Sequence, residues 1–475
     1  MRKQDYLVGL IAALTPNEKR YFKLFTSLQP GEKRYLKLFD ALENKSRYES
    51  AELCIELGTT ASQLADDKLY LTQILLQSLR NYDQEGTELT VLRNNRENVQ
   101  SLMNRRMFSF AIDLTEKTIE RSFELEAFDL IDGLLLLRSS CRQNLNQIPD
   151  KDDTLEQHDR AAKRLAEIIE MTSLRGQART LEMSDAAIKR YEKVLSNRLM
   201  KGGAAKLNSM RAKSLWYETM AHYYSAQDDG ASLLKLARAE RELYLKNPAI
   251  KIINPIVYIT NIFRLAESEG DFEVRQQLLS MLQKELADPE IKLSHQRRDS
   301  IVWGSTLMNL WNLRHLHRFK EAMSLAEKAY TQGQSRSEFD RFSSGFEYAL
   351  VLLHNDKATR AAEVLDEMLR YKPDIRFQSF VRIMHIMAQL DLRNYELIPH
   401  AIKATRFWLK KKEGDKAEIN LFLKHAGQIA KGPVNKSEEW KKLYQGLEDK
   451  KMESINSPLQ LSAWVKEILR KARTV

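Results

Sequence analysis

The sequence predicts an all-α protein, and three observations support this fold class. Apolar residues recur at i, i+3, i+4 and i+7 along nearly the whole chain, whereas the period-two alternation typical of strands is almost absent. The 475 residues include only 17 glycines and 10 prolines, so the chain makes few turns for its length. Hydrophobic residues at 43% and charged residues at 29% supply a sizeable core and a solvated surface, which excludes a disordered or low-complexity chain.

Two similar short helices are expected near the start of the chain. Residues 16–25, PNEKRYFKLF, recur as residues 30–39, PGEKRYLKLF, with eight of the ten positions identical. In each copy the proline suits the first helical position, and the glutamate two residues later complements the helix dipole. Thr15 adds a capping box with Glu18. The two helices carry twin apolar stripes and are separated by a break at Gln29–Gly31; the stripes are Tyr21, Leu24, Phe25 and Leu28, and Tyr35, Leu38, Phe39 and Leu42.

A short helix, a turn and a long helix follow between residues 50 and 82, in the order of a helix-turn-helix. DNA recognition by the long helix would need polar side chains at its N-terminal end. Thr60 and Gln63 are suitable there, whereas Asp66 and Asp67 would repel phosphate. We favour an ordinary helical hairpin and keep DNA recognition as the alternative.

Repeated helix pairs are expected from about residue 90 onward. Second helices open with an aromatic-x-x-small pattern at Phe108 and Phe319, and turn-and-aromatic entries occur at Phe272 and Tyr395. Small residues allow paired helices to approach closely, and the aromatic residue fills the seam between successive pairs. The clearest pair contains Phe346, Ala349, Leu350, Leu353, Ala362, Leu369 and Pro373.

With these positions, residues 90–430 resemble the tetratricopeptide-like superfamily of helical repeats. Val99 and Gly133 occupy the small position of successive first helices, 34 residues apart, and the later spacing is longer and irregular. The resemblance implies a right-handed α-α superhelix, which is a solenoid of antiparallel helix pairs. It also implies binding of proteins or peptides rather than catalysis.

The sequence predicts that the chain is divided into three segments. Residues 1–85 form a small N-terminal helical module, residues 86–435 form the repeat domain, and residues 436–475 form C-terminal capping helices. We expect the last helix to start at Ser457-Pro458 and to cover the open end of the solenoid with its apolar side. The alternative is that its basic side, with Lys466 and Arg470, meets an acidic surface.

Membrane and secretory classes do not fit the distribution of apolar residues. The four-leucine run that starts at Leu134 ends at Arg138, and no run approaches the 18 or so apolar residues of a membrane span. Asp5 and Pro16 interrupt the short apolar stretch at the N-terminus, and no small-residue cleavage site follows it. We therefore expect a cytoplasmic protein without a membrane span.

The sequence offers little for catalysis or metal binding. Cys54 and Cys141 are too few for a disulfide framework or a four-cysteine zinc site. Glycine-rich phosphate loops, H-E-x-x-H and G-x-S-x-G are absent from the sequence. His315 and His317 form the densest histidine cluster, but on a helix their rings point about 200° apart. We expect no enzyme activity, no cofactor and no metal site.

A candidate groove follows when the register of the resemblance is carried over position by position. The first helices of the pairs then direct a mixed polar set to the inner face of the solenoid, where it suits an extended peptide or a helix. Two alternatives stay open, namely a solvated inner face and a groove that is filled by the protein's own terminal helix. The set consists of Thr260, Arg264, Glu267, Asn312, His315, Glu347, His354, Gln378 and His385.

The net charge of +10 is concentrated at the two ends of the chain. Residues 1–50 contain ten basic and six acidic residues, and residues 401–475 contain seventeen and nine. The sequence between them is slightly acidic, so the charge argues only weakly for nucleic acid.

We expect a non-enzymatic scaffold that binds a protein or peptide of unknown identity. The alternative is a nucleic-acid-binding regulator that reads nucleic acid with residues 1–85 and uses the repeats as a sensor or oligomerisation domain. The sequence leaves open whether the chain forms a homodimer through its ends.

Overall fold

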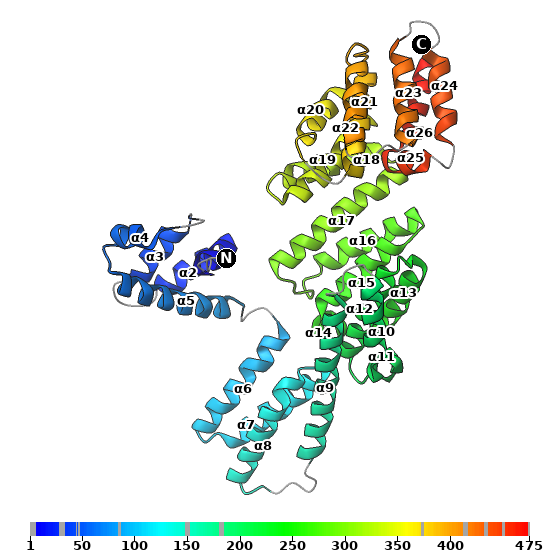
Figure 1. Cartoon of the computed structure of the whole chain (residues 1–475). Coiled ribbons are helices and arrows are strands. Elements are labelled where there is room, and N and C mark those ends of the chain that lie inside the picture. The colour runs from blue at the N-terminus through cyan, green and yellow to red at the C-terminus, as the bar shows by residue number, and fades with distance from the viewer. Residues whose placement is uncertain are drawn as a thin grey trace. The chain divides into compact units, whose positions relative to one another are not determined.

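In a computed structural model, the described residues are 6–27, 34–43, 45, 48–83, 87–147, 153–179, 185–371, 375–411, 417–431, 436–448 and 452–473. They form 26 α-helices and two 3-10 helices and contain no strand, which confirms the predicted all-α class (Figure 1). No helix within these ranges is long and apolar enough to cross a membrane. The predicted break at Gln29–Gly31 and the predicted helix end at Pro373 lie outside the described residues.

The chain divides into two compact units. The first comprises residues 1–219 with 249–254, and the second comprises residues 220–248 with 255–475. The helices of the first unit are α1 (Tyr6–Ala13), α2 (Pro16–Ser27), α3 (Arg34–Leu42), α4 (Ser50–Leu57), α5 (Ala61–Asp83), α6 (Glu88–Asn104), α7 (Phe108–Glu124), η1 (Phe128–Leu130), α8 (Ile131–Asn144), α9 (Thr154–Arg179), α10 (Asp185–Leu195), α11 (Arg198–Gly202), η2 (Ala204–Lys206) and α14 (Ile250–Ile253). Helix α12 (Met210–Ala226) contains the point in the sequence where the first unit ends.

The second unit contains the remaining helices. They are α13 (Gly230–Lys246), α15 (Pro255–Ser268), α16 (Phe272–Ala287), α17 (His295–His315), α18 (Phe319–Gly333), α19 (Glu338–Leu353), α20 (Ala358–Met368), α21 (Ile375–Asp391), α22 (Ile398–Lys411), α23 (Ala417–Lys431), α24 (Lys436–Leu447), α25 (Glu453–Leu459) and α26 (Leu461–Arg473).

Helices α1 to α5 share a hydrophobic cluster of their own, in which the long helix α5 packs against α2, α3 and α4. The predicted capping box starts α2, because Thr15 N donates to Glu18 Oε2 at 2.6 Å and Glu18 N donates to Thr15 Oγ1 at 3.3 Å. The predicted stripe of α3 is buried. The stripe predicted for α2 is wrong at one position, because Leu24 is 61% exposed. Helix α2 directs Phe22 into the core instead.

The second unit is an array of helices in which neighbours in the sequence pack together. From α15 to α24 each helix contacts the next, and the alternate helices α15, α17, α19, α21 and α23 also contact one another. The alternate helices therefore form one layer of the array, and α16, α18, α20 and α22 connect them.

A common turn ends three helices of this layer. His317, Asp356 and Arg393 have φ values of 54°, 59° and 58°, in the left-handed region. After each of them the next amide closes the helix end; for example, Arg318 N donates to Leu313 O at 2.9 Å. This is the Schellman type of helix end, which allows a tight reversal into the following helix.

Aromatic and small residues fill the seams of the array, as the sequence predicts. The ring of Phe272 stacks on His315, with centroids 4.8 Å apart, and the ring of Phe319 stacks on His354 at 4.0 Å. Ala322, on α18, is completely buried, as are two further alanines of the same face. The helix pair is close enough here that a Cβ on Gly333 would overlap with α19.

The predicted segments 1–85, 86–435 and 436–475 stay predictions. The boundary near residue 85 lies outside the described residues, and helices α24 to α26 share one hydrophobic core with the residues from 303 to 429.

Candidate functional site

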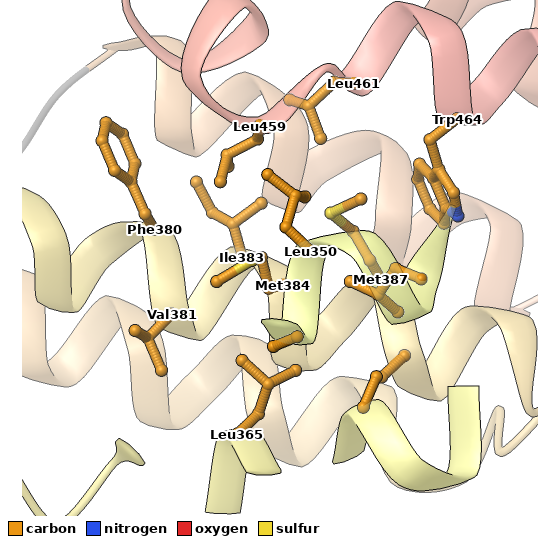
Figure 2. Packing of buried hydrophobic residues seen from close by; sticks show 14 of the residues in the cluster. Leu350, Leu365, Phe380, Val381, Ile383, Met384, Met387, Leu459, Leu461 and Trp464 are labelled. Atoms are coloured by element: carbon orange, nitrogen blue, oxygen red, sulfur yellow. The ribbon is translucent and has the colours of Figure 1, made fainter. Parts of the chain in front are cut away.

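The C-terminal segment packs over the layer of alternate helices in the second unit. Helices α25 and α26 meet at Gln460, whose φ is 52°, so the predicted helix start at Ser457-Pro458 is wrong: Pro458 lies inside α25 and the last helix starts at Leu461. Leu459, Leu461 and Trp464 are buried against α19 and α21, and Figure 2 shows their side chains directed toward Leu350, Met384 and Met387. Burial of these apolar side chains stabilises the docked segment.

Three polar side chains on successive alternate helices hold this segment. Arg314 of α17 donates from Nη1 to the carbonyl oxygen of Pro458 at 2.7 Å. His354, which directly follows α19, places Nε2 3.5 Å from the carbonyl oxygen of Leu459. Asp391 of α21 accepts from Trp464 Nε1 at 3.2 and 3.0 Å with its two carboxylate oxygens. We call Arg314, His354 and Asp391 the three anchors.

Burial changes the titration of two anchors. His354 is enclosed beside Phe319, and its burial lowers the pKa from 6.5 to about 3, so the ring is neutral at physiological pH. The pKa of Asp391 is raised from 3.8 to about 6, because burial penalises the carboxylate more than the bond from Trp464 stabilises it.

A pocket of about 820 Å³ lies beside the Pro458 end of the docked segment. It is bounded by α17, by residues 338–347 of α19, by the first half of α21, and by Ser457 and Pro458 of α25. Its lining is mainly aromatic and consists of Leu307, Trp311, Arg314, His315, Glu338, Phe339, Phe342, Ser343, Phe346, Glu347, Tyr371, Phe377, Phe380, Ser457 and Pro458. A volume of this size is typical of ligand sites in proteins.

Two rim residues extend the apolar surface beyond the pocket. Phe339 is 71% exposed and Phe377 is 39% exposed. The Phe377 ring packs at right angles to Phe346 and Phe380, with centroids 6.2 and 6.3 Å apart. The aromatic floor is thereby continuous with the outer surface, which suits a ligand that enters with one group and continues outside.

A buried ion pair forms the polar part of the pocket wall. Arg314, which is only 2% exposed, holds Glu347 with both arms of its guanidinium: Nε lies 2.8 Å from Oε2, and Nη2 donates to Oε1 at 3.2 Å. Burial raises the pKa of Glu347 although Arg314 opposes this. Because Arg314 also binds Pro458, one side chain fixes both the carboxylate and the C-terminal segment.

The structure brings together only part of the predicted groove. His315 and Glu347 line the pocket, and His354 lines a separate charged groove. The lowered pKa of His315 reflects its burial, and its Nδ1 lies 2.8 Å from the carbonyl oxygen of Trp311. The alternative of a groove filled by the terminal helix fits Glu347 and His354, since Glu347 holds an anchor of the C-terminal segment and His354 is one itself.

The other six predicted residues do not line this pocket. Arg264 pairs with the fully buried Glu240 at 2.8 Å, so it lies in the interior between α13 and α15. Asn312 is fully buried and donates to Phe272 O at 2.9 Å. The remaining positions are scattered: Thr260 donates to Ile256 O, Glu267 is exposed on α15, Gln378 is buried and donates to Tyr371 O, and His385 lies 3.2 Å from Asp366 Oδ1.

Sequence reasoning missed the aromatic residues of the pocket. Three of them, Phe339, Phe342 and Phe346, follow the spacing of one helix face, and Phe377 and Phe380 repeat it on α21. The signal in the sequence was the density of phenylalanine, which exceeds what a single buried stripe needs.

The chemical groups at the site follow from its lining residues. Within the described part of the chain, no three His, Cys, Asp or Glu side chains are grouped to hold a metal ion. The pocket offers apolar surface, the Arg314–Glu347 ion pair, the carboxylate of Glu338 and the imidazole of His315. Comparison with known proteins finds no matching family model, no matching curated protein and no matching solved structure.

Proposed function

We propose that the second unit is a binding module of the tetratricopeptide-like kind, acting as a protein-interaction scaffold that takes a segment of another protein. In this proposal an apolar side chain of the partner enters the aromatic pocket, and the partner's backbone continues over Phe339 and Phe377. The array of helix pairs and the aromatic seams between them support the comparison with helical repeats.

The observation that carries the proposal is the pocket with its exposed aromatic rim. A small molecule would be enclosed by the pocket alone, and would gain nothing from a phenylalanine that is 71% exposed at the edge. A peptide gains from both regions, because hot spots in protein interfaces are apolar anchors in pockets, surrounded by side chains that exclude water.

The alternative function, nucleic-acid binding by residues 1–85, has less support. Basic side chains of the duplicated helices lie in ion pairs: Lys23 Nζ lies 2.9 Å from Asp40 Oδ1, and Arg34 Nη2 lies 3.0 Å from Asp67 Oδ1. Cations that are paired in this way are less available to phosphates. A salt titration of DNA binding tests the alternative, since affinity for phosphate falls steeply with salt.

Selection of peptides from a random display library on the full chain tests the proposed function. We expect the selected peptides to share one large apolar residue, and to lose about tenfold to a hundredfold in affinity when Phe339→Ser and Phe377→Ser are combined. The matched control is Phe407→Ser, since Phe407 is 72% exposed on α22 and does not line the pocket. Peptides that bind the rim variant and the control equally would refute the proposal.

A further inference from the structure

A second groove lies beside α26, farther along the docked C-terminal segment than the aromatic pocket beside Pro458. It has a volume of about 1,670 Å³ and shares no lining residue with the pocket. Its walls are the turns that follow α17 and α19, the first turn of α18, and helices α24 and α26. The lining residues are His317, Arg318, Phe319, Lys320, Glu321, His354, Asn355, Asp356, Lys441, Tyr444, Gln445, Ser462, Ala463, Lys466, Glu467, Leu469, Arg470 and Lys471.

The groove carries a surplus of positive charge. Six lysine or arginine residues line it, against three aspartate or glutamate residues. Each acid is held by a cation of the same groove: Arg318 binds Glu321, Arg470 binds Glu467, and Lys471 binds Asp356. The Lys471–Asp356 pair also links α26 to the turn after α19.

Three cations of the groove are left over. Lys320, Lys441 and Lys466 are all exposed, and none has an ion-pair partner among the residues that the structure describes. They come from α18, α24 and α26, so three separate elements each direct a lysine to one groove. Like charges gathered in a groove repel one another, and a negatively charged ligand relieves this repulsion.

We propose that this groove binds an acidic peptide segment of a partner protein, with Lys320, Lys441 and Lys466 as its main charge contacts. A peptide with spaced Asp and Glu residues matches three spaced lysines and avoids the three carboxylates between them. A nucleic-acid strand fits less well, because its continuous phosphates would meet those carboxylates.

The inference does not depend on the proposed function, since the pocket and the groove have different linings and different chemistry. The rim variant of the aromatic pocket leaves every residue of the groove unchanged. The rim variant should therefore still bind an acidic peptide. A failure of the groove proposal is thus distinguishable from a failure of the pocket proposal.

Fluorescence anisotropy on the full chain tests the groove. The probe is a labelled peptide of alternating Glu and Gly, and the controls are the Gln-Gly peptide and single-stranded oligo(dT) of the same length. The variant replaces the three unpaired lysines by glutamine. A matched variant carries Lys284→Gln, Lys328→Gln and Lys403→Gln, three exposed lysines outside the groove.

We expect the Glu-Gly peptide to bind the native chain at low salt, and the groove variant to bind it at least about tenfold more weakly. The matched variant is expected to bind like the native chain, because its loss of net charge is the same but the groove is intact. Equal weakening in both variants would show that only the net charge acts, and would overturn the proposal. Binding of oligo(dT) that equals or exceeds that of the peptide and falls in the groove variant would also overturn it, and would identify a nucleic-acid surface.

Discussion

Acidification is expected to weaken the second unit through His354, and the size of the effect follows from its pKa. The pKa of this histidine is lowered from 6.5 to about 3 by burial. In the unfolded chain the imidazole of His354 therefore takes up a proton below about pH 6.5. In the folded chain the same imidazole stays neutral down to about pH 3. The contribution of His354 to stability is complete above pH 6.5 and is lost progressively as the pH falls toward 3.

At pH 5 the unfolded state gains about 2 kcal/mol from this protonation, since one pKa unit corresponds to about 1.36 kcal/mol. Asp391 acts in the opposite direction. Its pKa is raised to about 6, so protonation below that value favours the folded state by about 1.4 kcal/mol at pH 5. The contributions of His354 and Asp391 therefore largely cancel between pH 7.5 and pH 5.

The variant His354→Gln separates the two contributions. Glutamine keeps a donor for Leu459 O but does not titrate, while Asp391 is the same in both proteins. We expect the difference in unfolding free energy between the native chain and the variant to change by about 2 kcal/mol between the two pH values. Urea unfolding followed by tryptophan fluorescence is suitable, because five of the six tryptophans lie in the second unit.

The exposed His400 provides the control, and His400→Gln should show the pH dependence of the native chain. The reasoning would be refuted if the native chain and His354→Gln differed in unfolding free energy by the same amount at both pH values. It would mean that His354 accepts a proton in the folded state without cost, and hence that the C-terminal segment does not enclose it.

Three further predictions concern the same unit, and urea unfolding measures each of them. Asp391→Asn keeps an acceptor for Trp464 but removes a buried charge, so it should stabilise the unit by up to about 3 kcal/mol at pH 7.5 and by much less at pH 4. Arg314→Met leaves Glu347 as an unpaired buried carboxylate and should cost about 3–5 kcal/mol, most of which the double variant with Glu347→Leu should recover; no recovery would contradict the pairing. Arg393→Gly should add about 0.5–1 kcal/mol, because the φ of 58° suits glycine, whereas Arg393→Ala should add nothing.

The sequence was sufficient for the fold class because its signals are local. Apolar periodicity predicts helices, the Thr15–Glu18 capping box predicts the start of α2, and Phe272 and Phe319 predict the seams. Each of these patterns lies within a short stretch of sequence, although the seams themselves join successive helix pairs. The apolar face of α2 was placed incorrectly, because Phe22 and Leu24 are both apolar and only packing decides between them.

The pocket could not be predicted for two physical reasons. Its wall joins Arg314 to Pro458, which are 144 residues apart, and no local pattern reports such a contact. In addition, an error of one residue turns a helical position by 100°. The predicted register selected Asn312, which faces Phe272 and is fully buried, whereas the neighbouring Trp311 and Arg314 line the pocket.

Burial is the largest cause of the strongly shifted pKa values around the C-terminal segment. Two of the strongly shifted groups, His354 and Asp391, are anchors of the C-terminal segment, and Glu347 is held by the third anchor, Arg314. Apolar residues of the same size at these sites would bury the segment at lower electrostatic cost. The polar anchors add a defined position for the segment, because each of them forms its hydrogen bond with one particular residue of the segment. They fix where the segment lies across the helices, and so determine both the Pro458 wall of the pocket and the α26 wall of the groove.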